Sequence, residues 1–304
     1  MSRMHRFVER TPGRRLYAES RGTGAPLLLL HGFTGSVRAM APVIQSFERN
    51  FEVIAWDLIG HGRSAAPTDP DAYSFAACIA DAHAVLDAFG YESAHWIGYG
   101  LGARIALAAA TSAPDRIASM VLIAPSAGIA EPEERETRRR RDAELAESIA
   151  QKGVTHFVDR WMALPPFATQ QRLGKSALRE ARRDRLSHTP HGLAHALRGL
   201  GVASQPPLFE QLGDLRTPSL LILGELDAAC QAPVRDLAKR LPKATLCEIA
   251  DAGHAAHLEQ PEVFSHVVRE FLRTAPRPRA RETAPLETEP REGESRVEDS
   301  TKAS

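Results

Sequence analysis

Short apolar runs alternate with longer amphipathic stretches along most of the chain. Six runs indicate buried strands, because each is a continuous apolar series and not a strict alternation of apolar and polar residues. These runs are LLLLH (27–31), EVIAWD (52–57), AHWIGY (94–99), SMVLIA (119–124), SLLILG (219–224) and ATLCEI (244–249). Stretches 75–89, 101–111 and 234–241 have helical spacing. The alternation predicts an α/β fold with a mostly parallel, doubly wound sheet.

The alternation stops between residues 128 and 211, where the sequence is rich in helix-forming and charged residues. Strand and helix patterns resume at Pro218, so this stretch interrupts one domain and does not begin a second one. We therefore predict a core made of residues 1–127 and 212–274, with a helical cap inserted at 128–211. Residues 275–304 are rich in proline and mixed charge with few large apolar side chains, and we expect a disordered tail there.

The overall charge only excludes some classes of function. The 304 residues include 38 Lys and Arg and 38 Asp and Glu, so the chain has no net charge and no general affinity for nucleic acid or membranes is expected. The three cysteines are widely spaced and show no metal-ligand pattern. The first residues lack the apolar run of a signal peptide, and we expect a soluble cytoplasmic protein. The sequence does not predict an oligomeric state.

Two loops follow the first two of these strands. HGFTGS (31–36) is a turn of the kind that supplies a backbone N–H, here that of Phe33, to an oxyanion site. WDLIGHGRS (56–64) has glycines for a tight turn. We interpret Asp57 and Ser64 there as local hydrogen-bonding groups and not as catalytic ones.

A third motif, IGYGLGAR (97–104), lies between a predicted strand and a predicted helix. It matches the nucleophile elbow G-x-S-x-G, but Gly100 occupies the serine position. Glycine tolerates the positive φ of this turn, so the fold should survive while the nucleophile is lost. The amide after the elbow centre, that of Leu101, would be the second oxyanion donor. A dinucleotide-binding loop is excluded, because G-x-G-x-x-G would need glycine at Ala103.

The fourth motif is an acid–base pair. LILGELD places Asp227 at the end of a strand, and DAGHAAHLEQP places His254 in the loop after the last strand. The order elbow, acid, histidine is that of the α/β-hydrolase fold, which we therefore predict. His257 is better explained as a packing residue.

Within that fold the chain resembles 2-succinyl-6-hydroxy-2,4-cyclohexadiene-1-carboxylate synthase, a lyase of menaquinone biosynthesis. The resemblance covers about residues 12–273, and the cap carries it better than the elbow does. GYGLGAR is similar to the family's G-Y-S-L/M-G-G-R. The cap segments that resemble the family are SAGIAEPEERETRRRRD, FVDRWMALPPF and HGLAHALRGLGVASQPPL.

The resemblance implies elimination of pyruvate from a small polycarboxylate substrate, without metal or cofactor. Guanidinium groups bind carboxylates through two parallel hydrogen bonds. The substrate arginines implied by the match are Arg104, Arg138 and Arg185, with Tyr99 and Trp161 lining the pocket. Most of the arginine run 138–141 is expected to be a solvated helix face, with only one or two arginines directed to the ligand.

Gly100 leaves several functions open. The lyase serine is thought to act in proton abstraction, so Asp227 and His254 could take the proton directly or through a water. The alternatives are a ligand-binding pseudoenzyme and an active enzyme inactivated by a serine-to-glycine substitution. A serine hydrolase of esters is a more distant alternative, which would need a substitute serine such as Ser36 or Ser126.

Overall fold

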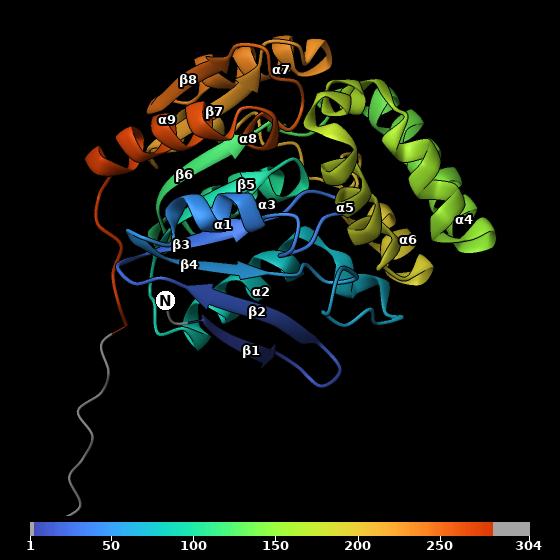
Figure 1. The fold of residues 1–304 in the computed structure, drawn as a ribbon, viewed down its shortest axis with the longest axis horizontal. Coiled ribbons are helices and arrows are strands. Elements are labelled where there is room, and N and C mark those ends of the chain that lie inside the picture. The colour runs from blue at the N-terminus through green and yellow to red at the C-terminus, as the bar shows by residue number, and fades with distance from the viewer. Residues whose placement is uncertain (1–2, 282–304) are drawn as a thin grey trace, which may run out of the picture.

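The computed structural model describes residues 3–281, and its centre is an eight-stranded sheet (Figure 1). The strand order is β1-β2-β4-β3-β5-β6-β7-β8. All neighbours from β4 to β8 pair in parallel, whereas β1 and β2 join the edge in antiparallel fashion. The strands are β1 (Arg3–Glu9), β2 (Arg15–Arg21), β3 (Ala25–Leu30), β4 (Phe51–Trp56), β5 (Ala94–Tyr99), β6 (Ile117–Ile123), β7 (Ser219–Gly224) and β8 (Ala244–Ile249).

The six predicted strands are confirmed as β3 to β8, with ends shifted by two residues at most. One detail of the prediction is wrong, because β8 is not buried like the others. It lies at the edge of the sheet, and of its six residues only Ile249 is fully buried. The strands β1 and β2 were not predicted, since their sequences are rich in charged residues and β1 exposes almost its whole length.

Helices cover both faces of the sheet, and each face has its own apolar core. One face is covered by α2 (Phe75–Ala88), α3 (Leu101–Ser112) and α7 (Ala228–Arg240). The other is covered by α1 (Ala41–Phe47) and α9 (Pro261–Thr274), with the short α8 (Ala256–Glu259) before it. The predicted helices 75–89 and 101–111 are therefore confirmed, and 234–241 is the second half of α7.

A helical segment connects β6 to β7 and lies to one side of the sheet (Figure 1). It contains α4 (Pro132–Met162), a 3-10 stretch (Pro165–Leu173), α5 (Gly174–Leu186) and α6 (Pro190–Leu200). Packing of α4 on α6 gives the segment a small core of its own, which includes Phe157 and Leu193. We propose that residues 128–211 form the cap. No helix within residues 3–281 is long and apolar enough to cross a bilayer.

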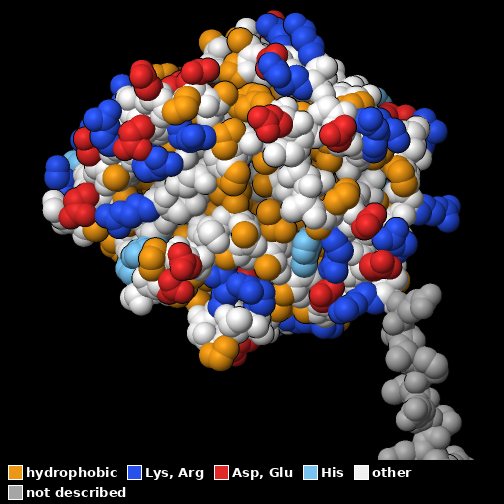
Figure 2. Space-filling model, turned by 180° about the vertical axis from the view of Figure 1, so that it is seen from behind, with side chains coloured by type: hydrophobic (Ala, Val, Ile, Leu, Met, Phe, Trp, Pro, Cys, Tyr) orange, Lys and Arg blue, Asp and Glu red, His pale blue; other side chains and the backbone are white. Residues whose placement is uncertain are grey.

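Positive and negative side chains are interspersed on the outside of the molecule, and some of them form ion pairs. Figure 2 shows Lys and Arg interspersed with Asp and Glu over the face opposite to that of Figure 1. On the cap, Arg139 pairs with Glu136 and Arg198 with Glu147, at 2.6 and 3.1 Å. Arg139, Arg140 and Arg141 are all exposed, as expected for the solvated part of the arginine run.

The C-terminal segment departs from the expected tail at its beginning. The amides of Glu92 and Ser93 donate to the carbonyl of Arg279, and the amide of Arg281 donates to Gly90. The low content of apolar side chains did not predict this contact with the core, because backbone hydrogen bonds form it. The expectation of disorder from residue 275 is therefore wrong as far as residue 281, and residues 282–304 lie outside the described part of the chain.

Candidate active site

Gly100 lies between β5 and α3, at the sharp turn that the motif predicted. Its φ of 52° and ψ of −105° belong to a region that side chains rarely adopt. A Cβ built on Gly98 would lie 2.5 Å from the carbonyl of Gly102, and one on Gly102 would lie 2.2 Å from the carbonyl oxygen of Leu30. A Cβ on Gly100 would meet no atom within 4 Å. The turn therefore requires glycine on both sides of Gly100, and space is open at Gly100 itself.

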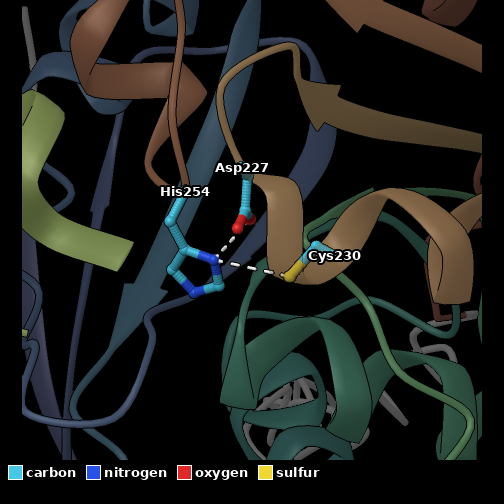
Figure 3. A group of neighbouring side chains, drawn as sticks. All are labelled: Asp227, Cys230 and His254. Carbon is cyan, nitrogen blue, oxygen red and sulfur yellow. Dashed lines mark hydrogen bonds and ion pairs between the residues drawn. The ribbon is translucent and has the colours of Figure 1, made fainter. Parts of the chain in front are cut away.

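His254 and Asp227 meet at the carboxyl edge of the sheet, where Nδ1 of the imidazole lies 2.7 Å from Oδ2 of the carboxylate (Figure 3). Asp227 precedes α7 and is 4% exposed, and His254 comes from the loop between β8 and α8. The carboxylate of Glu259 accepts hydrogen bonds from the amides of Gly253 and Ala255, which fixes this loop. The predicted pair is thus brought together, with Nε2 of His254 free of any partner among residues 3–281.

The two ionisable groups of this pair suit proton transfer. Burial acts to raise the pKa of the Asp227 carboxyl, but the hydrogen bond and charge of His254 outweigh it, so the pKa lies below its ordinary value. Asp227 therefore stays ionised and holds the Nδ1–H tautomer, which leaves the lone pair on Nε2. A neutral imidazole of this kind is a general base.

The loop after β3 carries the predicted oxyanion amide. Among the described residues, neither the amide of Phe33 nor that of Leu101 donates a hydrogen bond. The predicted structural role of the neighbouring loop is confirmed: Asp57 accepts hydrogen bonds from the amides of Val37 and Arg63, and the hydroxyl of Ser64 donates to the Asp57 carbonyl. The two free amides fit an oxyanion site, which stays a prediction.

Aromatic side chains connect the cap to the dyad. The ring of Trp161 lies 5.5 Å from that of Phe33 and 5.6 Å from that of Phe167, and Phe167 in turn lies 6.0 Å from the imidazole of His254. Tyr99 lies on another side of the same imidazole, with ring centroids 5.5 Å apart. Burial raises the pKa of the Tyr99 hydroxyl, so this group stays neutral. Tyr99 therefore contacts His254 directly, whereas Trp161 is connected to it only through Phe167, and the substrate-binding role of both stays a prediction.

Arg104 carries a half-buried guanidinium that forms no ion pair among the described residues. Its Nη1 is inaccessible to solvent and has no hydrogen-bond partner among the described residues. Burial, followed by the charge of Arg138, lowers the pKa of the guanidinium to about 10. The group remains charged at neutral pH, and an unpaired buried charge is costly unless an anion is bound. Arg104 is therefore placed to bind a carboxylate.

The other two predicted arginines have different surroundings. Nε of Arg138 donates to Oδ1 of the buried Asp142 at 2.8 Å, and the side chain is 46% exposed. Nη1 of Arg185 donates to the carbonyl of Ala181, while its Nε is buried without a partner in the described chain. Sequence reasoning missed Asp142, although its spacing of four residues from Arg138 is typical of a helical ion pair. Arg138 is thus partly neutralised, whereas Arg185 keeps a free donor.

A cavity of about 680 Å³ adjoins the dyad and is lined by Phe33, Tyr99, Arg185 and His257, among others. Gly100, Arg104 and His254 do not line it. Of the predicted substrate residues, Tyr99 and Arg185 line this cavity, whereas Arg104, Arg138 and Trp161 do not. His257 packs its ring 4.5 Å from that of Tyr99, which agrees with the predicted packing role.

The end of α5 is fastened to the core on both sides of Arg185. The hydroxyl of Ser36 donates to the carboxylate of Asp184 at 2.7 Å. Nε2 of His188 hydrogen-bonds to the carbonyl of Thr34, and Nδ1 accepts from the amide of Gly62. These bonds join the cap to the loop that carries Phe33. They were not predicted, because partners about 150 residues apart leave no local pattern in the sequence.

Three buried histidines at this junction make stability depend on pH. His31, His61 and His188 each accept one backbone N–H with one ring nitrogen and lie against a backbone carbonyl with the other. Burial lowers all three pKa values, that of His31 to about 3. The unfolded chain takes up these protons below about pH 6.5. The stabilisation that these neutral histidines provide is therefore fully present above about pH 6.5. It is lost as the pH falls from there towards the pKa values of the folded protein.

Below about pH 6.5 we expect the free energy of unfolding to fall by up to about 1.4 kcal/mol per pH unit for each such histidine. Urea unfolding between pH 8 and pH 5 measures this slope. His188→Asn keeps an acceptor for Gly62 but cannot be protonated, so it should flatten the slope. The matched control is His266→Asn, because His266 is exposed on α9. Equal slopes in the two variants would contradict the assignment to His188.

Comparison with known proteins identifies the family of the chain. The family model described as alpha/beta hydrolase fold matches residues 25–261, and the chain therefore belongs to the α/β-hydrolase family. A Bacillus subtilis (strain 168) protein provisionally named 2-succinyl-6-hydroxy-2,4-cyclohexadiene-1-carboxylate synthase is 34% identical over 81% of this chain and 89% of its own length. The synthase of Salmonella schwarzengrund (strain CVM19633) is 32% identical over 82% and 95%. Within the superfamily, the chain belongs to the family of these synthases.

Solved structures show the same relationship. MenH from S. aureus superposes with a TM-score of 0.80 at 29% identity, over 85% of this chain and 97% of that one. A malate-bound thermophilic esterase from Thermogutta terrifontis gives a TM-score of 0.77 at 29% identity, over 90% and 98%. The predicted fold and family are thus confirmed.

Proposed function

We propose that this chain is a carbon–oxygen lyase of menaquinone biosynthesis. It eliminates pyruvate from a multi-carboxylate cyclohexene substrate to give 2-succinyl-6-hydroxy-2,4-cyclohexadiene-1-carboxylate. The observation that carries the proposal is the Asp227–His254 dyad together with the guanidinium of Arg104, whose buried Nη1 has no partner among the described residues. Both features suit an anionic substrate that must lose a proton, and neither requires a covalent nucleophile.

The dyad supplies the base. His254 Nε2 takes a proton from a substrate carbon, and the C–H electron pair forms a carbon–carbon double bond as the carbon–oxygen bond breaks. Pyruvate leaves as its enolate and is then protonated. Because Gly100 has no hydroxyl, the proton reaches His254 directly or through a water in the open space at Gly100. Asp227 keeps the imidazole oriented and stabilises its charged form.

The remaining groups bind and stabilise charge. Arg104 and Arg185 each have a guanidinium nitrogen without a partner among residues 3–281, and these nitrogens bind substrate carboxylates. Arg138 contributes a third positive charge that Asp142 holds near Arg104. The amides of Phe33 and Leu101 bind the oxygen on which negative charge develops, and Tyr99 and Trp161 exclude water around it. The chemistry calls for no metal or cofactor.

The test is pyruvate release from the family substrate, followed by a coupled lactate dehydrogenase assay. We expect the chain to release pyruvate and His254→Ala to lower the rate by about 10²–10⁴-fold, the usual contribution of a positioned general base. Arg104→Met should mainly weaken substrate binding. Binding of the substrate without turnover, unaffected by His254→Ala, would instead identify a ligand-binding pseudoenzyme.

A further inference from the structure

Cys230 reaches the dyad from the first turn of α7. Asp227 caps this helix and Cys230 follows three residues later, where its amide hydrogen-bonds to the Asp227 carbonyl at 3.0 Å. One helical turn therefore places both side chains on the same side, facing His254 (Figure 3). Sγ of Cys230 lies 3.7 Å from Nδ1 of His254, and one ligand atom from each of the three residues lies within 4.8 Å of the other two.

We propose that Asp227, Cys230 and His254 form a binding site for zinc or a chemically similar divalent cation. The bound cation prevents His254 from acting as a base. The proposal does not depend on the reaction that the protein catalyses. The cysteines gave no sign of such a site in the sequence, because Cys230 has no cysteine or histidine at ligand spacing in its own segment.

The geometry fits a tetrahedral cation. Zinc binds thiolate sulfur at about 2.3 Å and imidazole nitrogen at about 2.0–2.1 Å. Two such bonds at a tetrahedral angle separate their ligand atoms by about 3.6 Å, close to the 3.7 Å between Sγ and Nδ1. The contact of 2.7 Å between Asp227 and His254 is a hydrogen bond and must lengthen by several tenths of an ångström. A small movement of the carboxylate therefore completes a three-residue site, with a water as the fourth ligand.

The donor set selects the metal. A thiolate with an imidazole favours zinc and its neighbours, whereas magnesium and calcium prefer oxygen ligands alone. Cys230 is half-buried and the His254 side chain is 21% exposed, so the site is open to solvent. Without metal the thiol is neutral, because burial and then the hydrogen bond and charge of Asp227 raise its pKa. A dication replaces the thiol proton, which passes to solvent. The single proton of the imidazole moves from Nδ1 to Nε2, so the ring stays neutral and binds the cation through Nδ1.

Occupation of the site removes the arrangement that makes His254 a base. The cation takes the Nδ1 lone pair and separates the ring from Asp227, so the carboxylate no longer stabilises a charged imidazolium. A metal-bound imidazole cannot accept a second proton without opposing the charge of the cation. Zinc therefore acts as an inhibitor of the proposed chemistry and not as its cofactor.

Binding of cobalt(II) gives a direct spectroscopic test of the site. The reduced full-length chain is titrated with Co²⁺, and we expect visible bands of tetrahedral cobalt, a near-ultraviolet thiolate-to-cobalt band, and displacement of both by Zn²⁺. Cys230→Ser and Cys230→Ala should abolish the thiolate band and weaken metal binding by at least about tenfold. The matched control is Cys247→Ser, because Cys247 is also a partly buried cysteine but lies on β8. That variant should keep both bands.

The proposal is overturned if the wild-type chain gives no tetrahedral spectrum, if Cys230→Ser keeps the thiolate band, or if Cys247→Ser loses it. The spectra need no substrate, so they decide on the metal site even when no pyruvate is released. Where pyruvate is released, Zn²⁺ should inhibit the wild-type chain and inhibit Cys230→Ser at least about tenfold less strongly, each relative to its own metal-free rate.

Discussion

Gly100→Ser is expected to raise the rate of pyruvate release by about 10²–10⁴-fold, the range that one positioned proton-transfer group contributes. The new Cβ meets no atom within 4 Å, so the side chain fits without displacing its neighbours. The hydroxyl would occupy the open space at Gly100 and would replace direct or water-mediated proton transfer to His254 by a fixed relay. Initial rates of pyruvate formation at saturating substrate measure the effect.

The matched control is Gly100→Ala, which has the same backbone strain and lacks the hydroxyl. Both variants should lose about 1–3 kcal/mol of stability, because φ at residue 100 is 52°. Only serine should increase the rate. Equal rates in the two variants would show that His254 acts without a hydroxyl relay. Restoration by serine from an undetectable level would exclude residual activity in the glycine form and so contradict the proposed function of the chain as it stands.

The parallel part of the sheet was predictable because each of its central strands is buried on both faces. Such strands are continuous apolar runs, and β5 and β7 are clear cases. The antiparallel pair β1 and β2 could not be found in this way. β1 is exposed along almost its whole length and is held by backbone pairing to β2, so its side chains carry no apolar signal.

The dyad was predictable for a different reason. Asp227 and His254 each follow a strand, and the carboxyl ends of neighbouring parallel strands β7 and β8 lie at the same edge of the sheet. Because these two strands are neighbours, the two side chains were expected to meet at that edge. Cys230 was missed because its role depends on the side of α7 that faces His254, which becomes visible only once the dyad is placed.

Contacts between the cap and the core could not be predicted from the sequence. Arg104 lies on the elbow helix, as the motif predicted. The link between Asp184 and Ser36 joins residues 148 positions apart, and no pattern in either segment marks it. The division of the arginines between the cavity and the elbow also depends on how the cap packs on the core, through contacts such as Trp161 on Phe33.

Gly102→Ala is expected to be more damaging to stability than Gly100→Ala, although both residues belong to the same elbow. Its Cβ would lie 2.2 Å from the carbonyl oxygen and 2.6 Å from the carbonyl carbon of Leu30. These are backbone atoms at the end of β3, and they cannot turn away as a side chain can. Overpacking commonly costs about 1–3 kcal/mol, and we expect a loss of about 3 kcal/mol here. Urea unfolding measures it.

We expect the same contact to influence the spacing of the two predicted oxyanion amides, because Leu101 begins α3 and Phe33 follows β3. Moving α3 away from β3 should therefore lower pyruvate release even when Gly100→Ser is also present. Gly213→Ala is the control, since its Cβ would meet no atom within 4 Å. The variant that combines Gly100→Ser with Gly102→Ala should therefore be slower than Gly100→Ser alone. If the two release pyruvate equally fast, the close packing of Gly102 on Leu30 supports only the fold.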